Sequence, residues 1–274
     1  MYPTYILVIL LVPALVAAGL AAGLIAGLLG VGGGIVIVPV LFELFTRLGY
    51  EPAVTMHLAV GTSLASIIPT SIAAVRTHIK RDAVDRDLLH RWAPAVVLGV
   101  AGGTILAGSV RGVVLTSVFG TVALLVALYM SVVKDDTRLR DGLPGRVTQS
   151  AIAALIGGFS AMMGIGGGTL TVPSLVLCSY PIRRAVATSS AIGMVIAIPG
   201  AFGFMATGWD VPGRPPLSIG FVSLLGLVLT APTAMLTAPY GARLAHSISQ
   251  LTLRRVFAGF LLLTSARMLS SLLG

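Results

Sequence analysis

The sequence predicts an all-α protein that crosses a membrane many times. Of its 274 residues, 56% are hydrophobic and only 10% are charged, and the mean hydropathy is +1.01. A soluble domain of this length would need far more charge on its surface. The apolar residues lie in continuous runs and do not alternate with polar ones, which favours helices over barrel strands. Helices also satisfy their own backbone hydrogen bonds in lipid, where no other partner is present.

The apolar runs form two sets of five. A hydrophilic stretch at 134–146 separates the sets. We therefore expect one integral membrane domain with a first transmembrane repeat at 1–133, a cytoplasmic linker at 134–146 and a second transmembrane repeat at 147–274. The runs lie at about 5–29, 33–46, 56–77, 92–109, 113–133, 147–163, 168–179, 185–207, 217–240 and 250–272.

One motif occurs twice, at the start of the second run of each set. Gly30-Val31-Gly32-Gly33-Gly34, with a proline at position 39, returns 134 positions later as Gly164-Ile165-Gly166-Gly167-Gly168 with a proline at position 173. The runs that follow have roughly 14 and 12 residues, or about 21 and 18 Å of helix, against a hydrocarbon core of ~30 Å. Each short helix should therefore begin inside the membrane, after a break at the glycines.

The basic residues decide between two topologies. If both short runs cross, the second set is inverted relative to the first and 14 of the 18 Lys and Arg residues lie on one side. If both turn back, the halves are parallel and the bases divide 11 to 7. The positive-inside rule favours the first arrangement. We predict ten membrane segments in an inverted repeat of five plus five, with both termini outside.

The two glycine motifs are the predicted binding site. A helix that begins inside the membrane exposes unpaired N–H groups and a partial positive charge, which attract anions. Paired glycine-interrupted segments at matching places in two halves typically mark a transporter's substrate site. The alternative is close helix packing, the interpretation that we favour for Gly19, Gly23, Gly27, Gly99 and Gly103. The candidate site glycines are Gly30, Gly32, Gly33, Gly34, Gly164, Gly166, Gly167 and Gly168.

Hydroxyl side chains form a second duplicated feature, in the third run of each set. Thr62 and Ser63 in the first half correspond to Thr188, Ser189 and Ser190 in the second. Hydroxyls can donate to an anion without the desolvation cost of a buried charge. They are candidate substrate ligands, and the alternative is that they bond to carbonyls of their own helices.

Few titratable residues lie in the apolar runs. Glu43 has Arg47 one turn later as its expected partner. His57, five residues before Thr62, is a candidate for carrying a proton with the anion, and the alternative is that it is a bystander at the membrane surface.

Several function classes have no support in the sequence. The net charge of +9 comes from bases in loops between apolar runs, so we attribute it to topology and expect no nucleic-acid partner. A nucleophile–base constellation and an HExxH pattern are missing from the sequence. We therefore expect no enzyme, no catalytic residue, no metal site and no cofactor.

These motifs together resemble those of one known family. GVGGGxxxVPxL, GIGGGxxxVPSL, HLAVGTSL and VATSS resemble the sulfite exporter TauE/SafE family over nearly the whole chain. The second half has Ala187 where the first has Gly61, and this departure leaves the hydroxyl pair intact. The resemblance implies a multi-pass permease of the plasma membrane, commonly the bacterial inner membrane, for small sulfur-containing anions such as sulfite, sulfonates or sulfoacetate.

We therefore hypothesise a secondary transporter, and in particular an exporter, that works by alternating access. An anion channel or facilitator, or a transporter of another small organic anion, is the alternative. The expected partners are the anionic substrate and the lipid bilayer, and the sequence is compatible with a monomer or a homodimer.

Overall fold

The protein is helical throughout. The computed structural model describes residues 4–29, 33–80, 82–132, 142–244 and 250–272. Within these residues the chain forms ten α-helices and a small hairpin, in which β1 (Ser218–Ile219) pairs antiparallel with β2 (Val222–Ser223). The all-α class is confirmed. The helices are α1 (Thr4–Leu29), α2 (Gly34–Arg47), α3 (Pro52–Ile79), α4 (Arg86–Ser109), α5 (Gly112–Val132), α6 (Arg146–Met163), α7 (Gly168–Leu177), α8 (Ile182–Thr207), α9 (Leu224–Leu244) and α10 (Gln250–Ser270).

Each predicted run contains a helix, but some helices begin elsewhere. The helices α3 and α4 start earlier than hydropathy predicts, because polar residues can form a first turn when it is capped. Pro52 occupies the first turn of α3, where no backbone N–H is needed, and the Asp85 carboxylate accepts a 2.9 Å hydrogen bond from the Leu88 N–H. The predicted run at 217–240 is corrected: its start is the hairpin, which turns at Gly220 with φ of 55°.

Five helices are long and apolar enough to cross a membrane, counted over the described residues alone: α3, α4, α5, α8 and α9. The chain is thus a multi-pass membrane protein. The helices α2 and α7 have 14 and 10 residues and are short, as the sequence predicts. The count of ten membrane segments and the inversion of the second half stay predictions.

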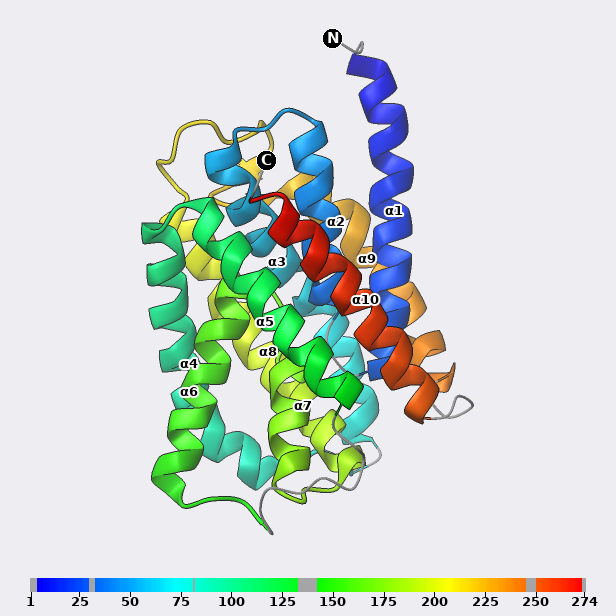
Figure 1. Ribbon diagram of the computed structural model, residues 1–274, viewed down its shortest axis with the longest axis vertical. Helices are drawn as coiled ribbons and strands as arrows, with labels where there is room; N and C mark the ends of the chain where they lie inside the picture. The colour runs from blue at the N-terminus through cyan, green and yellow to red at the C-terminus, as the bar shows by residue number, and fades with distance from the viewer. Residues whose placement is uncertain (1–3, 30–32, 81, 133–141, 245–249, 273–274) are drawn as a thin grey trace.

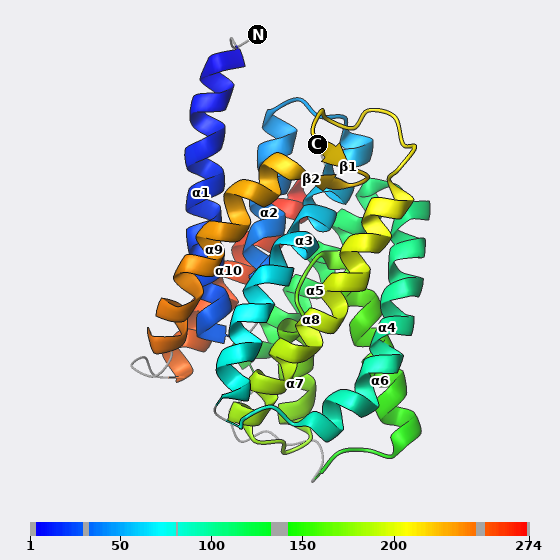
Figure 2. The same ribbon diagram turned by 180° about the vertical axis from the view of Figure 1, so that it is seen from behind.

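The helices α3 and α8 form the centre of the bundle. Their apolar segments are 72% and 67% buried, against 33% to 39% for α4, α5 and α9. The main contacts join the two halves: α1 packs on α9, α4 on α6 and α8, α3 on α8 and α9, and α5 on α10 (Figures 1 and 2). Exchanging α1–α5 with α6–α10 turns α1–α9 into α4–α6 and α4–α8 into α3–α9, and it leaves α3–α8 and α5–α10 unchanged, which supports a structural repeat.

The bundle has two distinct ends. The helix α1 begins, and α10 ends, at the end that carries the hairpin and the α2–α3 turn; we call this the upper end (Figure 1). The helix α6 begins at the opposite, lower end, together with the α3–α4 and α7–α8 connections. The topology prediction assigns the lower end to the cytoplasm. At the upper end the predicted Glu43–Arg47 pair is confirmed at 2.8 Å, and Arg267 of α10 adds a second bond to Glu43 at 3.0 Å.

Candidate functional site

Both glycine motifs interrupt a helix, as the sequence predicts. Gly164 has φ of 65° and ends α6, and α7 begins four residues later at Gly168. Gly33 has φ of 76° and precedes α2, which begins at Gly34. Glycine is favoured at both left-handed positions because it has no Cβ to clash with the backbone. Gly30 and Gly32 lie outside the described residues.

The structure brings the two motifs into backbone contact. A Cβ added at Gly34 would overlap the carbonyl oxygen of Gly164 and lie 3.0 Å from the Cα of Ile165. The helix α3 crosses the same place, since the Ser63 hydroxyl donates a 2.7 Å hydrogen bond to the Gly164 carbonyl. The break that ends α6 and the start of α2 thus meet in the protein interior, against the side of α3.

The N-terminus of α7 is enclosed by two other helices. The backbone of α8 touches the turn, because a Cβ at Gly167 would lie 2.9 Å from the Gly193 nitrogen. Gly166 lies on the same side: its Cα is 4.0 Å from the Cβ position of Gly193, and the Ser71 hydroxyl of α3 is 3.7 Å from that position. The amide end of α7 therefore faces α3 and α8 in the interior.

The predicted hydroxyl ligands are all buried, and each has a protein partner. Ser189 and Ser190 both donate to the Val186 carbonyl of their own helix, which is the alternative interpretation. Thr62 instead accepts a 2.8 Å bond from the Ser223 N–H of the hairpin. Ser63 bonds to Gly164, and Thr188 accepts a 3.0 Å bond from the Asp85 N–H. These last three hydroxyls connect separate segments of the bundle.

Three hydroxyls that the sequence interpretation missed lie around the second turn. Ser160 in the last turn of α6 and Thr169 and Thr171 in the first turn of α7 are at most 3% exposed. Their oxygens have no hydrogen-bond partner among the residues that the structure describes. A buried unpaired hydroxyl is unfavourable, so such groups typically mark a place where a ligand or water binds.

A comparison of the two motif copies could have found them. At the offset of 134 residues, Ser160, Thr169 and Thr171 correspond to Ala26, Ile35 and Ile37. The second copy is therefore polar where the first is apolar. This asymmetry is visible in the sequence once the copies are aligned.

His57 lies toward the upper end and is buried, with 3% of its surface exposed. Its Nδ1 is 3.1 Å from the Ala53 carbonyl oxygen and its Nε2 is 3.0 Å from the Ala107 carbonyl oxygen at the end of α4. The ring stacks on Phe221 of the hairpin at 4.8 Å. A carbonyl oxygen can only accept a hydrogen bond. A neutral imidazole has one N–H and can donate to one of these two carbonyls, whereas a doubly protonated ring can donate to both.

A polar network closes the lower end near Thr188. The Tyr180 hydroxyl donates to the Asp85 carboxylate, and the Asp85 N–H donates to the Thr188 hydroxyl. Burial raises the pKa of Tyr180, and the neighbouring Asp85 raises it further. Burial alone would raise the pKa of Asp85, but the bonds from Tyr180 and Leu88 and the charges of Arg184 and Arg91 together outweigh it and leave that pKa below its usual value.

The Asp85 network predicts an acid-dependent stability. A carboxyl whose pKa is lowered by folding stabilises the protein above its unfolded-state pKa of about 3.9, and this contribution is lost as the pH falls through the folded value. Asp85→Ala should cost about 1 kcal/mol of unfolding free energy at pH 7, since it removes the cap of α4. Asp85→Asn keeps a capping oxygen and should cost less. We expect both differences, measured as melting temperatures in detergent, to shrink below about pH 4; differences that do not change with pH would contradict this account.

Comparison with known proteins gives consistent matches. The family model described as "Sulfite exporter TauE/SafE" matches residues 15–268. A probable membrane transporter protein of Haemophilus influenzae is 32% identical over 241 residues, covering 87% of this chain and 90% of that protein. A probable membrane transporter protein of Methanocaldococcus jannaschii is 26% identical over 240 residues, 85% of each chain. The probable membrane transporter protein YunE of Bacillus subtilis is 29% identical over 203 residues, covering 66% of this chain and 73% of that protein. No solved structure shows significant similarity.

Proposed function

Because the chain belongs to the sulfite exporter TauE/SafE family of membrane transporters, we propose that it is a secondary transporter that exports small sulfur-containing anions such as sulfite, sulfonates or sulfoacetate. The substrate is proposed to bind at the second glycine turn, in the interior of the bundle. Alternating access, with the upper and lower ends opening in turn, is the proposed mechanism.

The observation that supports this site is the set of unpaired hydroxyls beside the amide end of α7. Ser160, Thr169 and Thr171 are buried and unpaired, and they lie in the last turn of α6 and the first turn of the ten-residue helix α7, on either side of the glycine turn in the sequence. Helix N-termini attract anions through free N–H groups and the helix dipole. Hydroxyls placed beside such an end can donate to the oxygens of a sulfite or sulfonate group. Gly166, Gly167 and Gly168 allow the ligand to approach this backbone closely.

The proposed site attracts the anion without a full positive charge. Among the described residues, none of the buried side chains is Lys, Arg, Asp or Glu. Binding to neutral donors is weaker than binding to a buried arginine, which suits a carrier that must release its substrate on each cycle. In a cell whose interior is negative, export of a monovalent anion is favoured by about 2.3 kcal/mol per 100 mV of membrane potential.

Both ends of the bundle have bonds that alternating access would break in turn. At the lower end, Thr188 of α8 accepts a bond from the Asp85 N–H, and Tyr180 holds the Asp85 carboxylate. At the upper end, Thr62 of α3 is held to the hairpin through the Ser223 N–H. We infer that Thr62 and Thr188, at matching positions of the two repeats, act as gate contacts of the two ends. Ser63 is proposed to position the Gly164 turn through its 2.7 Å bond to the Gly164 carbonyl.

The proposal is tested with purified protein in liposomes loaded with sulfite. We expect saturable sulfite release that sulfonates compete with. Exchange of internal for external substrate should be faster than net release, as in a carrier. Single-channel currents, or flux that does not saturate, would instead favour an anion channel. The proposed function would be refuted if the protein transported none of sulfite, thiosulfate, sulfonates and carboxylates, and if none of them competed for binding.

The proposed location is the bacterial inner membrane, with both termini outside and an inverted repeat of five plus five segments. The placement of both termini on one side is supported by the fold, since α1 begins and α10 ends at the same end (Figure 1). Tags at both termini test the orientation. Labelling of either tag only from the cytoplasmic side would contradict it.

His57 is proposed as the proton-linked residue. The carbonyls of Ala53 and Ala107 and the ring of Phe221 face it from α3, α4 and the hairpin. Protonation would strengthen the contact between α3 and the end of α4, and so oppose opening of the upper end. We expect His57→Gln, which cannot change charge, to weaken the pH dependence of transport between pH 5.5 and 8 at least about threefold relative to the wild type. An unchanged pH profile would assign His57 a purely structural role.

A further inference from the structure

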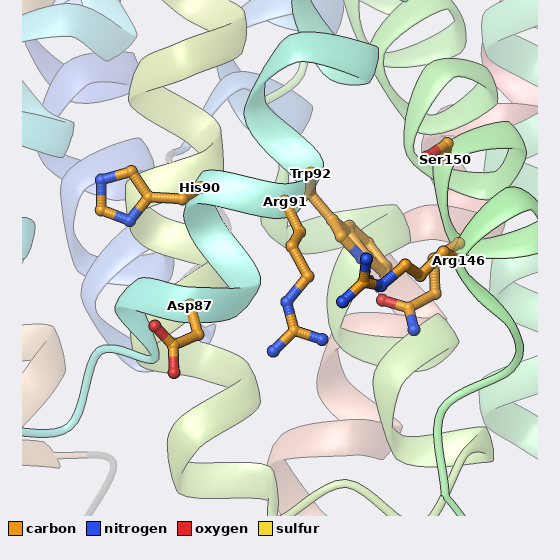
Figure 3. A pocket seen from close by; sticks show the side chains of 7 residues that line it. Asp87, His90, Arg91, Trp92, Arg146 and Ser150 are labelled. Atoms are coloured by element: carbon orange, nitrogen blue, oxygen red, sulfur yellow. Dashed lines mark hydrogen bonds between the residues drawn. The ribbon is translucent and has the colours of Figure 1, made fainter.

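A polar pocket lies at the lower end, between α4 and the start of α6 (Figure 3). The second glycine turn follows the other end of α6 and does not line this pocket. Its volume is about 600 Å³, which lies in the range of small-molecule sites. The side chains of Arg91 and Arg146 extend into the same opening from the two helices, while the His90 ring points away from Arg146. The pocket is lined by Asp87, His90, Arg91 and Trp92 of α4 and by Arg146, Gln149 and Ser150 of α6.

The inner wall of this pocket is fixed by hydrogen bonds. The buried Trp92 donates its indole N–H to the Gln149 side-chain oxygen at 3.1 Å. The Gln149 side-chain nitrogen donates in turn to the Pro144 carbonyl at 2.7 Å. Because this wall joins the second turn of α4 to the first turn of α6, it keeps the backbones of Arg91 and Arg146 at a set spacing.

The charge of the pocket favours an anion. Arg91 and Arg146 are exposed, and neither forms an ion pair within the part of the chain that the structure describes. Asp87 is the one carboxylate in the lining, so the two arginines leave a net positive charge. Two helices also begin here, at Arg86 and Arg146, and add their partial positive charges. Paired guanidinium groups are suited to bidentate binding of phosphate.

The surface above the pocket indicates where such a phosphate would come from. Leu98 and Ile105 of α4 are 73% and 65% exposed, and Val147 and Leu155 of α6 are 85% and 61% exposed. In a multi-pass membrane protein these apolar side chains face lipid tails. The topology prediction assigns the lower end to the cytoplasm, and basic pockets between membrane helices on that side typically bind anionic lipid head groups.

We propose that Arg91 and Arg146 bind the phosphate of an anionic phospholipid whose tails lie along the outer face of α4 and α6. The bound lipid links the second turn of α4 to the first turn of α6, and so stabilises the contact between the two halves of the protein. This site is independent of the proposed transport site and does not require that the substrate be sulfite.

The test uses the full-length protein purified in a neutral detergent. Phosphatidylglycerol, phosphatidylcholine and inorganic phosphate are added separately, and binding is measured by melting temperature and by native mass spectrometry. The test variant is Arg91→Gln with Arg146→Gln. Arg86→Gln with Arg183→Gln is the control, because it removes the same charge from exposed residues at the same end that do not line the pocket.

We expect phosphatidylglycerol to raise the melting temperature of the wild type and of the control, and phosphatidylcholine to raise neither. The test variant should bind phosphatidylglycerol about tenfold more weakly or worse, since charge-assisted hydrogen bonds are lost. If that variant does not purify, the two single variants are compared in the same way. Equal responses of test and control variants would overturn the proposal. An equal response of the wild type to inorganic phosphate would instead indicate a site for a soluble anion and would also overturn it.

Discussion

Replacing Gly34 by alanine should abolish transport and destabilise the protein. The added methyl group would overlap the Gly164 carbonyl oxygen and lie 3.0 Å from the Ile165 Cα, and backbone atoms cannot move aside as a flexible side chain can. Overpacking of this kind costs about 1–3 kcal/mol or more. Gly34 is helical, and alanine is intrinsically favoured in a helix by about 1 kcal/mol, so a loss of stability reports the contact between the motifs.

The matched control is Gly102→Ala in α4. Gly102 is also helical, but a Cβ there meets no atom within 4 Å. This variant should keep transport and should be as stable as the wild type or slightly more so. Melting temperature and sulfite release from liposomes are measured for both. Normal transport by Gly34→Ala would show that close contact of the two turns is not needed for function.

The second large effect is expected when Thr169 and Thr171 are both changed to valine. Valine keeps the shape of threonine and removes the hydroxyl. Since a buried unpaired hydroxyl costs about 1–3 kcal/mol, the ligand-free variant should be as stable as the wild type or more stable. Transport should fall by at least about tenfold, because each bond to a charged ligand contributes about 1.5–3 kcal/mol.

This opposite change in stability and transport distinguishes a binding role from a packing role. Thr116→Val in α5 is the control: its buried hydroxyl donates to the Gly112 carbonyl at 3.0 Å, so the variant should lose some stability and keep transport. A Thr169→Val, Thr171→Val variant that transports at the wild-type rate would remove the second turn from the proposed site. A variant that both unfolds and fails to transport would assign the two residues to packing.

Close packing at Gly19, Gly23, Gly99 and Gly103 was also predictable, and for Gly27 it stays a prediction. Gly19 and Gly23 pack against α9, and Gly99 and Gly103 pack against α6, where a Cβ at each would lie too close to the neighbouring helix. Four-residue spacing of small residues is a local pattern, so the sequence contains it in full. Which helix would be the partner was not in the sequence, because these partners are at least 50 residues away in the chain.

The sequence by itself determined the helical class, the position of nearly every helix and the two breaks. These properties depend on local hydropathy and on glycines that allow a left-handed turn, and a helix in lipid satisfies its hydrogen bonds within one segment. Only the tertiary structure decided which polar groups are paired. Ser63 reaches Gly164 across 101 positions and Thr62 reaches Ser223 across 161, whereas Thr169 and Thr171 find no partner among the described residues. Pairing depends on which distant helix faces each side chain, and hydropathy along the chain does not encode that.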